Sequence, residues 1–119
     1  MMDLAIRTVK DKGDLDKERI VIEVKANVDI GTYIIFDTTY NDDDSISSKL
    51  RHTYWLPDKE LSAGDLVVVY TRKGTARLRT NQDNTKTLFL YWGLDETVWN
   101  KDKDCALIIK IASWNWKNV

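Results

Sequence analysis

Cysteine and histidine are nearly absent from this sequence, since Cys105 and His52 are the single examples of each. A lone cysteine can form no disulfide within the chain, and one Cys and one His far apart lack the paired spacing of a structural zinc site. A Cys-His nucleophile would need both of them and a third, orienting residue, which the sequence does not indicate. We therefore predict no enzymatic activity, no metal and no cofactor. Cys105 is expected to be a small buried residue, and His52 a structural or surface residue.

The sequence also lacks linkers between domains, long apolar runs and an excess of one charge. Pro57 is the only proline, five glycines are scattered along the chain, and no Pro-rich or Ser/Gly-rich linker divides it, so we predict one domain over residues 1–119. No segment approaches the roughly 18 apolar residues of a membrane helix, and the first residues do not resemble a signal peptide, so we expect a soluble, cytoplasmic protein. The 18 Lys and Arg balance 19 Asp and Glu, and a net charge of -1 gives no global field for nucleic acid.

Apolar and polar residues alternate with a period of two along most of the chain, which is typical of strands. Ile20, Ile22 and Val24 share one face of such a strand, with Glu23 and Lys25 opposite. The run 66–70 is apolar throughout and predicts a strand buried on both faces at the centre of the fold. No segment has helical periodicity over three turns. We predict an all-β fold, an immunoglobulin-like antiparallel β-sandwich, with strands at 3–10, 18–28, 31–40, 50–56, 66–70, 88–92 and 105–111. Residues 76–80 are expected to form a short strand or an extended loop.

Short motifs in this order resemble those of the lamin tail domain family. They are Gly31-Thr32-Tyr33-Ile34-Ile35, Tyr54-Trp55-Leu56-Pro57, Leu61-Ser62-Ala63-Gly64-Asp65, the apolar strand 66–70, and Trp92-Gly93. The resemblance covers residues 20–111, and the segment 42–49 lengthens a connection that is often shorter in the family. It implies a sandwich of the lamin-tail type that serves as an interaction module. It implies no catalytic residues, and in lamins the domain is linked to contacts with DNA and protein partners.

Basic residues cluster around Gly74, where Arg72, Lys73, Arg77 and Arg79 stand beside threonines. Guanidinium groups on a loop bind phosphates, and an exposed aromatic ring nearby stacks on a base, so this cluster is the candidate for nucleic-acid binding. Surface Lys and Arg balanced by acidic residues elsewhere are also normal for a soluble protein. Both interpretations remain open at this point.

The five tryptophans carry more information than the charges. At least two of them should fill the core, and Trp92 and Trp99, on either side of Gly93, suggest a packed corner. Trp114 and Trp116 lie two residues apart in the C-terminal tail and therefore share a face if the tail is extended. That face either packs on the sandwich or forms an exposed surface for a protein partner or a second copy.

Acidic segments give two weak cation candidates. Asn100-x-Asp102-x-Asp104 resembles the start of a calcium loop, but the positions that should hold Gly and Glu are Cys105 and Ile111, so a solvated turn is predicted. Asp42, Asp43 and Asp44 are expected to be solvated charges in a loop. The leading functional hypothesis is thus a non-enzymatic protein-interaction module, and the alternatives are carbohydrate binding through exposed Trp faces or nucleic-acid binding through the basic cluster.

Overall fold

The computed structural model describes residues 2–119 and contains strands, turns and one short 3-10 helix, η1 (Ile30–Thr32). The predicted all-β class is confirmed, and every predicted strand has a counterpart within a few residues. Asp29 caps η1, because its side chain accepts a hydrogen bond from the Gly31 amide. Among the described residues, no helix is long and apolar enough to cross a membrane.

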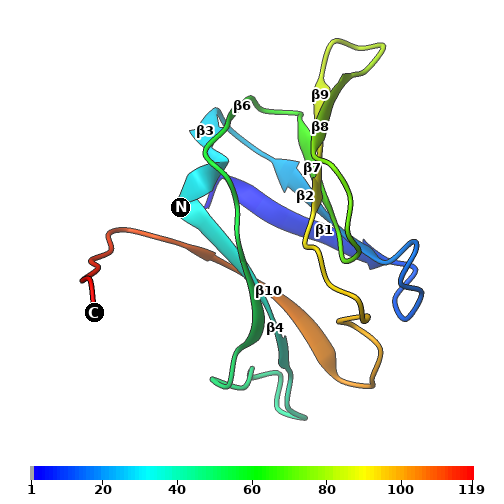
Figure 1. Ribbon diagram of the computed structural model, residues 1–119, viewed down its shortest axis with the longest axis vertical. Coiled ribbons are helices and arrows are strands. Elements are labelled where there is room, and N and C mark those ends of the chain that lie inside the picture. Colours follow the sequence, from blue (N-terminus) through cyan, green and yellow to red (C-terminus); the bar gives the residue numbers. More distant parts are fainter. Residues whose placement is uncertain (1) are drawn as a thin grey trace.

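The larger sheet has five strands in the order β1-β2-β7-β9-β8. Figure 1 shows this sheet together with the hairpin between β8 and β9, which projects from the body of the protein. The apolar strand 66–70 is β7, and it lies in the middle of this sheet as predicted. The bounds are β1 (Leu4–Lys10), β2 (Arg19–Val24), β7 (Leu66–Tyr70), β8 (Arg77–Thr80) and β9 (Lys86–Tyr91).

The smaller sheet has three strands in the order β10-β4-β5. They are β4 (Tyr33–Thr39), β5 (Arg51–Trp55) and β10 (Asp104–Lys110), and both pairings are antiparallel. A third pair, β3 (Val28–Asp29) with β6 (Glu60–Leu61), makes a short two-stranded ribbon. After β10 the chain runs away from the sheets as an extended tail (Figure 1).

One pairing corrects the sequence analysis: β7 and β9 are parallel, so the prediction of a wholly antiparallel sandwich is wrong for this pair. After β7 the chain passes to the sheet edge and runs back as β8. The β8–β9 hairpin then returns β9 into the space between β7 and β8, in the direction of β7. Parallel neighbours need such a long connection, and here strand β8 supplies it.

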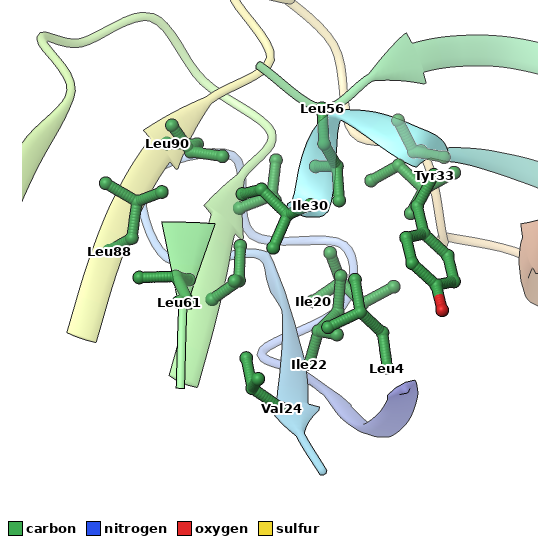
Figure 2. Close-up of a cluster of buried hydrophobic side chains, with 14 of the residues drawn as sticks. Leu4, Ile20, Ile22, Val24, Ile30, Tyr33, Leu56, Leu61, Leu88 and Leu90 are labelled. Atoms are coloured by element: carbon green, nitrogen blue, oxygen red, sulfur yellow. The ribbon is translucent and has the colours of Figure 1, made fainter. Parts of the chain in front are cut away.

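The core lies between the two larger sheets (Figure 2). The five-stranded sheet contributes Ile20 and Ile22, both fully buried, together with the alternate residues Val67 and Val69 of β7. The three-stranded sheet contributes Tyr33 and Ile35, on the face opposite Ile34 and Phe36. Trp99 joins this cluster and meets Trp92 edge-on at 5.8 Å, so the predicted aromatic corner is confirmed. Burial of this apolar surface is the main term that stabilises the fold.

A fully buried carboxylate, Glu18, connects three separate segments beside this core. Its Oε1 accepts hydrogen bonds from the Thr71 hydroxyl at 2.6 Å and the Val98 amide at 2.7 Å. Its Oε2 accepts from the amides of Gly13 at 2.9 Å and Trp99 at 3.2 Å. A buried charge is tolerated only when its acceptor sites are used in this way. Glu18 therefore fixes the turn before β2, the end of β7 and the segment that leads to β10.

Candidate functional site

The three-stranded sheet has apolar side chains on both of its faces. Tyr33 and Ile35 point into the core with Ala106 and Ile108, so their alternate neighbours lie on the other face. The outer face of an antiparallel sheet is usually polar because water covers it. Here it carries Ile34, Phe36, Trp55, Leu107 and Ile109, which we call the apolar outer face.

Strand register places these residues in two adjacent rows. Ile34 pairs with Ile109 on one side and Trp55 on the other, while Phe36 pairs with Leu107 and Thr53. Directly paired side chains lie about 5 Å apart and touch one another across the strands. A further row pairs Thr38 with Cys105, so the positions of β4 and β10 on this face are uncharged.

Trp55 is held in place at the edge of this face. Its indole Nε1 donates a hydrogen bond to the Gly31 carbonyl at 2.7 Å, yet the residue is 46% exposed. The ring of Trp114 packs edge-on against it at 5.3 Å with an interplanar angle of 88°. The tail thereby extends the apolar outer face beyond the strands.

The two tail tryptophans named from the sequence are both exposed, at 61% for Trp114 and 76% for Trp116. The tail is not folded into the sandwich, which leaves the exposed-surface interpretation of this pair. Strand β5, which carries Trp55, is also an edge strand, because β4 is its only neighbour in the sheet. Exposed aromatics beside an unpaired edge are characteristic of binding surfaces.

The basic residues named from the sequence lie on the other sheet. Arg77 and Arg79 stand over the Phe89 ring, and Arg72 reaches the rings of Tyr70 and Tyr91. Lys73 is exposed on the connection after β7, and its carbonyl accepts a hydrogen bond from Arg72. The arginines are therefore brought together by the sheet, whereas they are separated from Trp114 and Trp116.

His52 and Cys105 do not form a catalytic pair. His52 Nδ1 lies 2.8 Å from Asp37 Oδ1, and Asp37 also pairs with Arg51 at 3.4 Å. Asp37 is only 2% exposed and lies on the core side of β4. Its neighbour Thr38 lies on the opposite face of the strand, and Cys105, which pairs with Thr38, lies on that face as well. His52 consequently serves as a partner of a buried carboxylate, in agreement with the structural interpretation. Cys105 is half-buried, which is less than predicted.

The acidic loops are closed by their own hydrogen bonds. Asp104 accepts from the Lys101 amide at 2.8 Å, Asn100 donates to Thr97, and Asp42 pairs with Lys103. Within residues 2–119, no group of three or more His, Cys, Asp or Glu residues converges on a point where a metal ion would bind. Residues 101–103 form the turn that leads into β10.

Sequence reasoning missed the apolar outer face. Alternation along 33–36 puts Ile34 and Phe36 on one side of the strand and Tyr33 and Ile35 on the other, but all four are apolar, so the pattern does not say which side meets the core. The available signal was that 34–36 and 106–109 are apolar at consecutive positions, which a strand with one solvated face does not require.

Neither a scan against protein-family models nor a search of curated proteins finds a match for this chain.

Proposed function

We propose that this protein is a non-enzymatic protein-interaction module and that its apolar outer face binds a second copy of the chain. The observation that carries this proposal is the uncharged face built from Ile34, Phe36, Leu107 and Ile109, with Trp55 at its edge. A contiguous exposed apolar patch costs free energy in water and marks an interaction site. A face of this kind is complementary to itself, because apolar rows meet apolar rows under twofold symmetry.

The size of the face sets the expected strength of the contact. Strands β4 and β10 are seven residues long in a three-stranded sheet, and with spacings of about 4.8 Å and 3.4 Å they span roughly 340 Å² per partner. A standard interface buries about 800 Å² per partner, so the strands alone are too small. Trp114 and Trp116 enlarge the surface, since a tryptophan buries roughly 150–250 Å². We therefore expect a reversible dimer at micromolar concentrations instead of a permanent one.

The geometry favours a protein over a carbohydrate as the ligand of the tryptophans. Sugar rings stack on flat aromatic platforms, so carbohydrate binding through these tryptophans would need exposed, coplanar rings. Trp55 and Trp114 meet at 88°, so the two rings form a corner and not a platform. A corner of this shape instead holds a bulky side chain from a protein partner.

We also propose that the fold is an immunoglobulin-like sandwich of the lamin-tail type. Support comes from the motifs on which the resemblance rests. Gly64 has a φ of 95° in the turn that leads into β7, and Gly93 has a φ of 86° directly after Trp92, so both need the conformational freedom of glycine. An experimental structure tests the proposal through its strand connectivity, with the parallel β7–β9 pair as the point of comparison. A connectivity that differs from that of lamin tail domains would reject the relationship.

Sedimentation velocity across a concentration series tests the proposed association. The chain has a mass of 13.8 kDa, and we expect the weight-average mass to rise towards twice that value with concentration. Ile109→Glu places a charge in the contact and should hold the protein as a monomer, since an unpaired buried charge is strongly unfavourable. A wild-type mass that stays at the monomer value through the millimolar range would refute the proposed dimer.

Leu78→Glu is the matched control. Leu78 lies in an edge strand like Ile109, and the two side chains are similarly exposed, at 42% and 38%. The same change in charge and size is thereby made on the other sheet. Loss of association in both variants would indicate a general effect of added charge and would count against the apolar outer face.

A further inference from the structure

The five-stranded sheet carries a second unusual surface, on the side that faces away from the main core. Val21, Val68 and Phe89 form a separate apolar cluster there, and each is only 7% exposed. Tyr70 and Tyr91 lie beside it, stacked at 5.3 Å with an interplanar angle of 13°. Arginine side chains cover this cluster. We call the whole surface the arginine-aromatic face.

The guanidinium groups lie close to the aromatic rings. The guanidinium carbon of Arg77 is 4.4 Å from the centre of the Phe89 ring, and that of Arg72 is 5.1 Å from the centre of the Tyr91 ring. A guanidinium over a ring can still donate its N–H groups to carboxylate or phosphate oxygens. Arg72 already donates two of them, to the carbonyls of Asp16 and Lys73. Within the described part of the chain, the Arg77 side chain makes no hydrogen bond or ion pair.

A second set of cations stands on the opposite side of the same cluster. Arg7, Lys10 and Arg19 line a recess of about 300 Å³ whose floor includes Val68 and Phe89. The acidic groups that pair with these cations are Glu23, 3.1 Å from Arg7, and Asp11, 2.7 Å from Arg19. Cations thus outnumber acidic partners on this face, although the whole chain has a net charge of -1. The positive charge is local and is invisible in the overall composition.

We propose that the arginine-aromatic face binds single-stranded nucleic acid. The five strands make a surface roughly 19 Å wide, at about 4.8 Å between neighbours, with cations along both sides of an aromatic and apolar strip. Phosphates are bound by guanidinium N–H groups that have no partner in the protein, such as those of Arg77, and unpaired bases stack on the guanidinium groups that cover the rings. A duplex keeps its base faces hidden, and an acidic peptide pairs with the cations but offers no base to stack on them, so a single strand matches the surface best.

Fluorescence anisotropy with a labelled oligothymidine of about 20 nucleotides, titrated at low salt and again at rising salt, tests this inference. Arg77→Ala should weaken binding roughly 5- to 20-fold and reduce the salt slope by about 0.7 if Arg77 contacts one phosphate. Arg79→Ala should have a similar effect. Because both residues are exposed in the edge strand β8, the variants should keep the fold, and their thermal unfolding checks this.

Lys117→Ala is the control, since it removes one positive charge from the exposed tail beyond the other sheet. We expect it to leave the affinity and the salt slope unchanged. Absence of binding at low salt, or equal losses in Lys117→Ala and Arg77→Ala, would overturn the proposal. Equal affinity for a duplex or for polyglutamate would also overturn it, because the face would then recognise negative charge without reading unpaired bases.

Discussion

Replacing Glu18 by glutamine is the sharpest perturbation of the fold that the structure offers. Each of the two carboxylate oxygens of Glu18 accepts two hydrogen bonds, and the four donors are three backbone amides and the Thr71 hydroxyl. Glutamine keeps the shape of the side chain but replaces one oxygen by an NH2 group, which cannot accept. The substitution therefore changes hydrogen bonding without leaving a cavity.

The better orientation of the new amide follows from the donors. At the position of Oε2 the NH2 group would face the Gly13 and Trp99 amides, and both would lose their acceptor. At the position of Oε1 it would face Val98 and Thr71, and the Thr71 hydroxyl can turn round to accept. One buried amide, that of Val98, then remains without an acceptor, and the bonds that remain are no longer charge-assisted. We expect a loss of about 2–4 kcal/mol in the free energy of unfolding.

Urea denaturation monitored by tryptophan fluorescence measures this loss, with Thr71→Val as a companion variant. Thr71→Val removes one donor and leaves the carboxylate with three, so it should cost about 1–2 kcal/mol, less than Glu18→Gln. A cost below about 1 kcal/mol for Glu18→Gln would refute the assignment of Glu18 as the connection between the three segments. A larger cost for Thr71→Val than for Glu18→Gln would contradict the same reasoning.

Two further outcomes are expected. Gly74→Ala would place a methyl group into the ring of Tyr91, so the ring should move and its stack with Tyr70 should loosen. We expect the affinity for oligothymidine to fall while the sedimentation behaviour stays unchanged. Unaltered affinity in the anisotropy assay would argue against a role for these rings. Hydrogen bonds from the Thr85 side chain and then from its backbone lower the pKa of Asp83 below 3.8. The ionised form is therefore favoured in the folded hairpin, and the resulting stabilisation is present above pH 3.8 and is lost as the pH falls further below that value. The Thr85 amide resonance, followed by NMR, should shift in that acid range in the wild type but not in Asp83→Asn, and an identical titration in both proteins would exclude this cause.

The strands were predictable because their signal is local. Alternation in Ile20, Ile22 and Val24, and the unbroken apolar run of β7, are both read within a few residues, and both elements lie where they were expected. The parallel β7–β9 pair was not predictable in the same way. It depends on which space in the sheet the returning hairpin fills, and that choice involves residues far apart in the sequence.

The candidate sites were predictable only as fragments. Arg72, Arg77 and Arg79 are close in sequence, so their cluster was recognised, whereas Arg7 and Arg19 join them only through the pairing of β1, β2 and β7. Glu18 looked like an ordinary charged residue at the start of a strand. Its donors come from positions as distant in the chain as Gly13 and Trp99, and no local pattern links them.

A dilution series followed by backbone amide NMR shows whether two copies meet through the apolar outer face. We predict that the amide shifts of Ile34, Phe36, Trp55, Leu107 and Ile109 change together with concentration, with one common dissociation constant, while those of β8 stay constant. Shifts that do not change with concentration, or changes confined to the five-stranded sheet, would contradict association through this face.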